Sequence, residues 1–211
     1  MAKILITSGP TRQYLDPVRY LTNASSGRMG AALAASAVEL GHEVIIVSGP
    51  VHVAYPAEAK VISVVTTQEM LDAACEAFHA VDGVIGAAAP CDYQPRHVAT
   101  QKLSKTGEPL QLQLIETPDV IATLGQRKRP DQWVVGFALE TEDQHFRAIV
   151  KLERKLCDLM VSNGPEAIDA DSNHVDLLDP AGNVLATLEG SKQAVAKSLM
   201  REITARLVTS G

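Results

Sequence analysis

The sequence predicts an α/β fold in which helices cover both faces of a doubly wound, mostly parallel sheet. Short aliphatic runs alternate with longer amphipathic stretches along most of the chain. These runs contain few polar residues, as expected of strands that are buried on both faces. The 211 residues, 46% of them hydrophobic and 21% charged, are enough for one sizeable core. We therefore expect a single Rossmann-like domain over residues 1–211.

The predicted strands are short and mostly aliphatic. Six of them alternate with predicted helices, at residues 3–7, 43–48, 60–65, 83–87, 133–138 and 158–161. Two further runs, 174–178 and 183–188, flank the turn sequence Asp-Pro-Ala-Gly at 179–182. An antiparallel hairpin is therefore expected near the C-terminus.

Helices are predicted from apolar residues at i, i+4 spacing and from capping residues at the helix ends. Within 28–40, Met29, Leu33 and Ala37 are four residues apart, and Gly41 follows as a C-terminal cap. Pro118 is expected to begin a short helix, because its missing N–H costs nothing in the first turn. The remaining markers are the capping-box pair Thr66 and Glu69 before 70–78, and the apolar stripe Val195, Leu199, Ile203 and Leu207.

Two segments interrupt this alternation. Residues 8–26 separate the first strand from the first helix and exceed the usual length of such a connection, which indicates a functional loop. Residues 93–117 contain Pro95, Gly107 and Pro109, and include the alternating run 110–114 that is typical of a half-buried strand. We expect 93–117 to form a flap or hairpin excursion within the domain.

Composition excludes several classes of protein. The net charge of −6 and the 4% aromatic content disfavour binding to nucleic acid or to anionic membranes. The three cysteines are too few and too far apart for a disulfide framework or a zinc site. The first residues do not resemble a signal peptide, and no apolar run is long enough to span a membrane. These observations predict a cytoplasmic protein.

Ligands of doubly wound sheets bind at the carboxyl ends of the strands, where the strand order reverses. Ser25, Ser26 and Gly27 lie between the first strand and the first helix. Small residues here suit an anion at the positive end of the helix, and simple N-capping by either serine explains them equally well. The turn at 7–12 lacks the G-x-G-x-x-G fingerprint, which argues against an NAD site.

The segment after the fourth strand has a second set of candidates. Gly86, Ala87 and Ala88 would let a flat base or a ribose approach the backbone closely. Asp92 then either binds Mg²⁺ or a hydroxyl group, or forms an Asx turn. Lys102, on the predicted flap, is either a solvated side chain or a lid cation for a polyphosphate.

Arg147, Lys151 and Lys155 are four residues apart on a predicted helix and therefore share one face. Their charges repel one another unless they are offset, so two interpretations remain open. Either an anion binds to this face, or it is a solvated face relieved by Glu153 and Asp158. Cysteine and histidine supply no candidate nucleophile or metal site.

Short motifs, in order along nearly the whole chain, resemble those of phosphopantothenoylcysteine synthetase, a ligase of coenzyme A biosynthesis. They are TSGPTR at 7–12, DPVRYLTNASSG at 16–27, VSGP at 47–50, AAPCDY at 88–93, KLSK at 102–105, TPDV at 117–120, VGFALET at 135–141, KLERK at 151–155, and Asn163. The family joins 4′-phosphopantothenate to L-cysteine through an acyl-nucleotidylate, with CTP in most bacteria and ATP in eukaryotes. In many bacteria the enzyme is fused to a flavin-dependent decarboxylase.

The resemblance implies roles for individual residues, with CTP as the co-substrate. It gives catalytic roles to Asn23, Lys102 and Asp92, and places Asp92 also at Mg²⁺. The nucleotide site that it implies comprises Gly86, Ala87, Ala88, Asp92, Lys102, Pro118, Asp119, Val120, Ile121, Phe137, Lys151 and Lys155. The residues that it implies for the other substrate are Arg19, Asn23, Ser25, Ser26 and Gly27.

The resemblance also implies the partners of the chain, which are small-molecule substrates and a second copy of the chain. The two copies would form a homodimer through residues 93–117. FMN is not expected. A separate decarboxylase is a candidate partner. Two alternatives stay open. An NAD(P)-dependent oxidoreductase is disfavoured by the missing glycine fingerprint, and a non-catalytic nucleotide-binding module is disfavoured by the joint presence of Asn23, Asp92 and Lys102.

Overall fold

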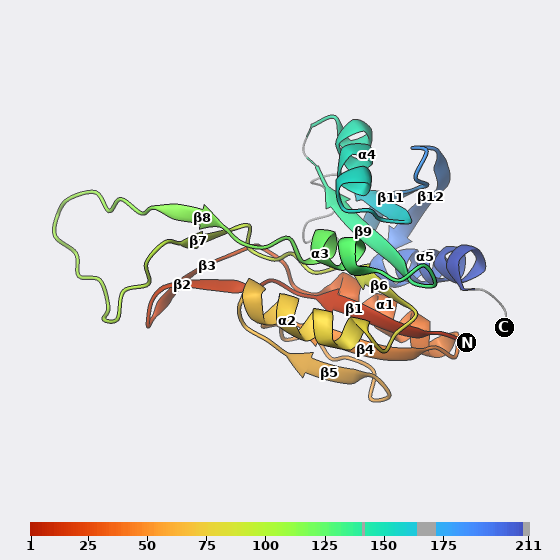
Figure 1. Cartoon of the computed structure of the whole chain (residues 1–211), viewed down its shortest axis with the longest axis horizontal. Helices are drawn as coiled ribbons and strands as arrows, with labels where there is room; N and C mark the ends of the chain where they lie inside the picture. Colours follow the sequence, from red (N-terminus) through yellow and green to blue (C-terminus); the bar gives the residue numbers. More distant parts are fainter. Residues whose placement is uncertain (141, 164–171, 209–211) are drawn as a thin grey trace.

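The computed structural model describes residues 1–140, 142–163 and 172–208, so Thr141 of the VGFALET motif lies outside the described part (Figure 1). Its centre is an eight-stranded sheet of order β12-β11-β10-β9-β6-β1-β4-β5. Six strands are parallel: β1 (Lys3–Ser8), β4 (Glu43–Ser48), β5 (Lys60–Ser63), β6 (Gly83–Gly86), β9 (Trp133–Leu139) and β10 (Leu159–Asn163). The antiparallel hairpin of β11 (Ser172–Leu178) and β12 (Val184–Ser191) extends one edge. The predicted fold class is confirmed.

Helices cover both faces of this sheet, because the central strands have buried apolar side chains on their two sides. On one face, α1 (Arg28–Glu39) and α5 (Lys192–Leu207) pack on a core that includes Ile4, Ile6 and Val161. On the other face, α2 (Thr67–Phe78), α3 (Val120–Arg127) and α4 (Gln144–Arg154) enclose a second core. Among the described residues, no helix has the length and apolar character needed to cross a membrane.

The helix caps in the structure agree only in part with those predicted from the sequence. Thr66 and Glu69 form the predicted capping box of α2, and Gly41 follows α1 with a φ of 82°. The expected helix start at Pro118 is wrong: Asp119 is the N-cap of α3, because its carboxylate accepts the Ala122 N–H at 3.1 Å. N-capping by a serine is also wrong for α1, whose N-cap is Gly27 with no side-chain hydrogen bond.

The two interrupting segments together form an arm, defined here as residues 12–22 and 93–116, which extends away from the sheet (Figure 1). The expected loop at 8–26 contains a hairpin of β2 (Arg12–Asp16) and β3 (Arg19–Thr22). The expected excursion at 93–117 contains a second antiparallel pair, β7 (Tyr93–Pro95) and β8 (Leu114–Glu116). The predicted strand at 110–114 begins only at Leu114, which pairs with Pro95, and one further hydrogen bond joins the Arg96 N–H to the Gln113 carbonyl at 2.9 Å.

A buried carboxylate fastens the two parts of the arm to each other. Asp16 accepts backbone hydrogen bonds from Val18, Arg19 and Leu103 at 2.9–3.1 Å, and it forms an ion pair with the Arg19 guanidinium. Burial opposes ionisation of this carboxyl, but these hydrogen bonds outweigh it and lower the pKa of Asp16 to about 2. Arg19 also donates to the Leu103 carbonyl. Leu103, the residue that follows Lys102, is therefore held against the β2–β3 hairpin.

Buried hydroxyl groups fasten the base of the arm to the body. The Cys91 carbonyl accepts hydrogen bonds from Thr67 at 3.2 Å and from Thr117 at 2.7 Å. Thr11 accepts the Cys91 N–H at 2.8 Å and lies 2.7 Å from the Thr67 hydroxyl oxygen. Because Thr67 belongs to α2, these contacts tie the beginnings of both hairpins to the same helix.

Candidate active site

The candidate site lies where the strand order reverses. From the centre of the sheet, β1 connects through α1 to β4 on one side, and β6 connects onward to β9 on the other. The chains that leave β1 and β6 therefore diverge and leave a crevice at their carboxyl ends. Gly86 ends β6 against α3, where an added Cβ would lie 2.5 Å from side-chain carbons of Ile121. Glycine is needed at this position for the close approach of strand and helix.

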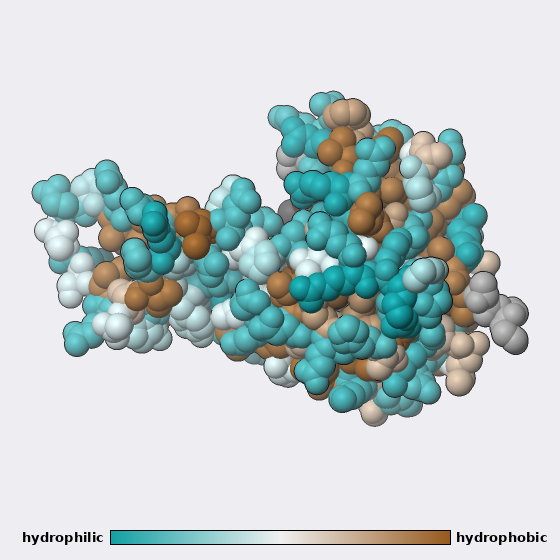
Figure 2. Space-filling model, viewed as in Figure 1, coloured by the Kyte–Doolittle hydropathy of each residue, from teal (hydrophilic) through white to brown (hydrophobic). Residues whose placement is uncertain are grey.

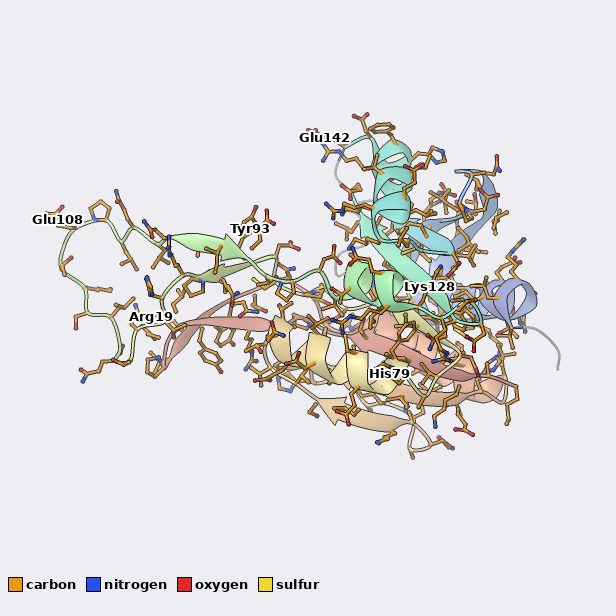
Figure 3. The ribbon with its side chains drawn as sticks, viewed as in Figure 1. Arg19, His79, Tyr93, Glu108, Lys128 and Glu142 are labelled. Carbon is orange, nitrogen blue, oxygen red and sulfur yellow. The ribbon has the colours of Figure 1, made fainter. Side chains whose placement is uncertain are left out.

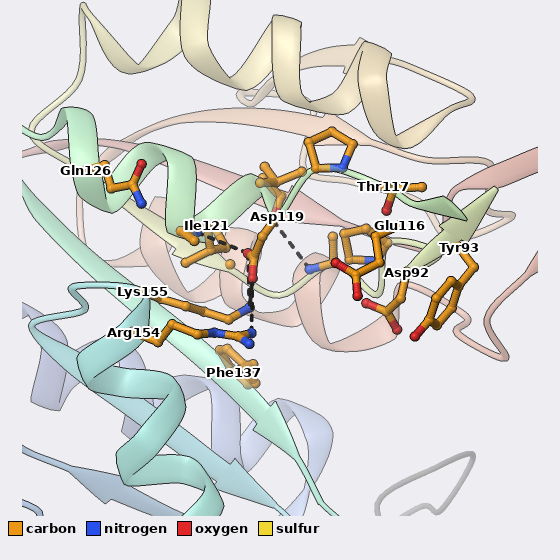
Figure 4. Close-up of a pocket in the computed structure, with 17 residues that line it drawn as sticks. Asp92, Tyr93, Glu116, Thr117, Asp119, Ile121, Gln126, Phe137, Arg154 and Lys155 are labelled. Carbon is orange, nitrogen blue, oxygen red and sulfur yellow. Dashed lines mark hydrogen bonds and ion pairs between the residues drawn. The ribbon is translucent and has the colours of Figure 1, made fainter. Parts of the chain in front are cut away.

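The first of two cavities at this crevice has a volume of about 460 Å³. It is enclosed by the ends of β6 and β9, the segment from β8 into α3, and the C-terminal end of α4 (Figure 4). Several residues that the sequence analysis placed at the nucleotide line it: Gly86, Ala88, Asp92, Pro118, Asp119, Val120, Ile121, Phe137 and Lys155. Ala87 and Lys151 line the second cavity instead.

Positive and negative charges are paired on one wall of the first cavity. The Asp119 carboxylate lies 3.0 Å from the Lys155 ammonium and 3.5 Å from the Arg154 guanidinium (Figure 4). Burial opposes ionisation of Asp119, but the charge of Lys155 and the N–H of Ala122 outweigh it and lower its pKa. The Lys155 side chain is only 18% exposed, so Asp119 fixes a positive charge against the cavity.

Neighbouring carboxylates offset the charges along α4, but they are not the ones that the sequence suggested. Lys151 pairs with Glu140 and Arg147 with Glu142, while Lys155 pairs with Asp119. Relief by Asp158 is wrong, since its carboxylate pairs with Lys128 at 2.7 Å. Two of the three cations, Lys151 and Lys155, still reach a cavity.

The opposite wall of the first cavity has two exposed carboxylates. Asp92 follows β6, Glu116 ends β8, and both project into the cavity beside Tyr93 (Figure 4). In the described part of the chain, no group of three or more histidine, cysteine or acidic residues could hold a metal ion. One or two carboxylates that share the ion with substrate phosphates are the usual way in which proteins bind Mg²⁺. Asp92 and Glu116 fit that arrangement.

The second cavity, of about 510 Å³, adjoins the first and shares Ala88, Pro90, Asp92, Phe137 and Lys155 with it. It collects predicted substrate residues from the loop before α1: Asn23, Ser25, Ser26 and Gly27. The Asn23 amide donates to the carbonyls of Pro90 at 2.8 Å and Ala89 at 3.3 Å. These bonds join the loop before α1 to the segment that leads from β6 into the arm.

Two predicted site residues do not line either cavity. Lys102 is an exposed residue of the arm, and Arg19 is held by Asp16 and Leu103 (Figure 3). In this structure neither side chain meets Asp92 or Lys155. Their predicted roles therefore need a movement of the arm or contact with a second copy of the chain.

Sequence reasoning missed several residues that line the cavities. In the first cavity these are Tyr93, Glu116, Thr117, Gln126 and Arg154. In the second they are Arg28, Asn173 and Lys192, together with Asn163, which had been quoted without a role. Asn163 ends β10 of the main sheet, and that position was the available signal. No pattern singles out Asn173 or Lys192.

Comparisons with known proteins place the chain in a family. The family model described as "DNA/pantothenate metabolism flavoprotein C-terminal domain" matches residues 1–207. Coenzyme A biosynthesis bifunctional protein CoaBC of Haemophilus influenzae is 38% identical over 206 residues, and CoaBC of Bacillus subtilis is 39% identical over 207. These alignments cover 96% of this chain and 51% of each relative, so the chain spans about half the length of the curated relatives it matches.

Solved structures agree with this assignment. The crystal structure of the C-terminal domain of CoaBC has a TM-score of 0.81 at 36% identity and covers 97% of this chain and 96% of that one. The DNA/pantothenate metabolism flavoprotein of Streptococcus pneumoniae, with a TM-score of 0.85 at 24% identity over 97% of this chain and 99% of that one, shares the fold. The resemblance found in the sequence is confirmed: the chain belongs to the family of the DNA/pantothenate metabolism flavoprotein C-terminal domain.

Proposed function

We propose that this chain is a cytoplasmic phosphopantothenate–cysteine ligase, which activates 4′-phosphopantothenate with CTP and Mg²⁺ and joins it to L-cysteine. The observation that carries the proposal is the pair of adjoining cavities that share Asp92 and Lys155. A nucleotide in the first cavity can present its α-phosphate to an acyl substrate in the second. The family relatives named as coenzyme A biosynthesis proteins support the same substrate class.

In the first step, the substrate carboxylate attacks the α-phosphorus of CTP, and pyrophosphate leaves with its bonding electron pair. Lys155 and Lys151 offset the negative charge of the phosphates, while Asp119 holds Lys155 in place. Asp92 and Glu116 are the residues that would hold Mg²⁺, which supplies further charge neutralisation when bound. The side chains position and neutralise the reactants, and no activated protein nucleophile is needed.

In the second step, the cysteine amine attacks the acyl carbon of the acyl-cytidylate, CMP leaves, and the amine loses a proton. Asn23 lies in the second cavity, beside the carbonyls of Ala89 and Pro90. The N–H that makes the longer bond, to Ala89, would turn to the acyl group, while the 2.8 Å bond to Pro90 keeps the loop before α1 against the segment after β6. The reaction transfers no electrons, so we expect no requirement for FMN.

Lys102 reaches the triphosphate in this proposal only if the arm moves or a second copy supplies it. Large exposed apolar side chains gather on the arm (Figure 2): Val18, Tyr20, Tyr93, Val98, Leu110, Leu112, Leu114 and Ile115. Exposed apolar patches of this kind are typical of an interface. We propose a homodimer through the arm; a decarboxylase partner remains a separate proposal, which co-purification would test.

The test of the proposed function is a two-stage assay with purified protein, 4′-phosphopantothenate, Mg²⁺ and either CTP or ATP. Pyrophosphate should form with CTP, with a higher kcat/KM than with ATP, and phosphopantothenoylcysteine should appear only when cysteine is added. Absence of both pyrophosphate and product would refute the function.

The proposed homodimer has its own test. Ile115→Asp should lower the oligomeric state in sedimentation analysis, whereas Val150→Asp, at an exposed apolar position on α4, should not.

A further inference from the structure

A buried amide in the second cavity has a donor group without a partner among the residues that the structure describes. Asn173 is 4% exposed, and its side-chain nitrogen makes no hydrogen bond to the described part of the chain. Its side-chain oxygen accepts a hydrogen bond from the Lys192 ammonium at 3.1 Å, which fixes the orientation of the amide. A buried N–H without an acceptor is costly, so such a group is a candidate for ligand binding.

The surroundings of Asn173 favour an anion. Asn173 and Val175 lie on the same face of β11, and Val175 packs in the core beneath α1 and α5. Lys192 is the first residue of α5, and residues 25–29 at the start of α1 line the same cavity. Two helix N-termini, with their partial positive charge and N–H groups, thus lie along this cavity.

The charged side chains of the second cavity are mostly basic. Arg28, Lys151, Lys155 and Lys192 line it, and Asp92 is the acidic residue among the described lining. Glu140 offsets Lys151, and Asp119 offsets Lys155. Asp92 also faces the first cavity, so basic side chains outnumber acidic ones along the described lining of the second cavity.

We propose that Asn173 and Lys192 form a subsite for a phosphoryl group in the second cavity. A tetrahedral phosphoryl group has several acceptor oxygens, so it can take the Asn173 N–H and the Lys192 ammonium together. This inference deepens the proposed function and rests on it. That function provides two sources of the group: the phosphate ester of 4′-phosphopantothenate and the polyphosphate of CTP.

The test compares direct binding to three variants by calorimetry. Asn173→Asp keeps the acceptor for Lys192 but replaces the donor with a negative charge, and Lys192→Gln removes the cation. Lys197→Gln is the matched control, since it removes one positive charge from the same helix at an exposed ion pair with Glu39. The probes are inorganic pyrophosphate, CTP, 4′-phosphopantothenate and unphosphorylated pantothenate, and thermal melting confirms that each variant is folded.

We expect Asn173→Asp and Lys192→Gln to weaken the binding of a phosphorylated probe about tenfold or more. The affinity of pantothenate for these variants, and of every probe for the control, should change less than twofold. If only the affinity for 4′-phosphopantothenate falls, the phosphate ester occupies the subsite. If the affinities for CTP and pyrophosphate fall, the polyphosphate occupies it. Folded variants that bind every phosphorylated probe within twofold of the wild type would overturn the subsite, even if the wild type makes product. If the wild type binds pyrophosphate through these residues but makes no product, the subsite stands and the proposed function fails.

Discussion

Asp119 combines two stabilising contacts that substitution can separate. Asparagine is as good an N-cap as aspartate, so Asp119→Asn keeps the hydrogen bond from the Ala122 N–H and loses only the ion pairs. Asp119→Ala loses both. The cap contributes about 1 kcal/mol, and the half-buried ion pair with Lys155, discounted for partial exposure, about 1 kcal/mol. We expect the free energy of unfolding to fall by about 1 kcal/mol in Asp119→Asn and by about 2 in Asp119→Ala.

Urea unfolding can measure this difference through the single tryptophan, Trp133, which is 5% exposed at the start of β9. The pKa of Asp119 is lowered in the folded state, so its ion-pair contribution is complete above the ordinary carboxyl pKa of about 4. As the pH falls below that value, the contribution is lost, and the wild type should approach Asp119→Asn in stability. Equal losses in both variants at pH 7, or a difference from Asp119→Asn that does not shrink in acid, would refute this account.

Three further predictions concern the arm and the second cavity. Lys102→Gln should leave the melting temperature unchanged, because the residue is exposed. It should raise the activation barrier of single-turnover pyrophosphate release by about 2–4 kcal/mol, so that release is slower. Release at the wild-type rate would contradict the role of Lys102. Asn23→Asp should bind CTP but consume the acyl-cytidylate more slowly than it forms it, and rapid-quench sampling that shows equal loss of both steps would leave Asn23 a purely structural residue. Asp16→Asn should speed limited proteolysis at 96–113, because the Arg19 and Leu103 contacts weaken; digestion as slow as in wild type would argue against the fastening.

The sheet was predictable because its strands are recognisable one at a time. Runs such as β4 and β9 are aliphatic throughout, and they need no knowledge of their neighbours to be identified as buried strands. The β2–β3 hairpin was missed because its residues lie outside the two cores. In this hairpin, the Arg12 guanidinium lies 4.5 Å from the centre of the Tyr20 ring, and cross-strand pairs stabilise the two strands. Burial of apolar side chains stabilises the strands of the main sheet instead.

Part of the site was predictable from the order of elements, and part from the family motifs, as for Asp119 and Lys155. Asp92 and Asn23 lie in segments that adjoin β6 and α1, so their position could be inferred from the order of elements. Asn173 and Lys192 lie 19 residues apart and meet because β11 and β12 pair, which places Asn173 opposite Gly190. That contact depends on the register of a hairpin, which no local pattern in the sequence specifies.

The contacts at the base of the arm have a mechanical consequence. At the start of both hairpins, threonine hydroxyl groups converge on the backbone of Cys91, and further out the Ala99 N–H donates to the Leu15 carbonyl at 2.9 Å. Bending one hairpin without the other would break several of these bonds, so the arm should swing as a stiff lever that pivots beside α2. Arg19 lies far along the arm from that pivot (Figure 3) and donates to the carbonyl of Leu103, the residue after Lys102, so Arg19 and Lys102 would move together. A movement of the arm that brings one of these cations to a substrate would therefore bring the other one close to it as well.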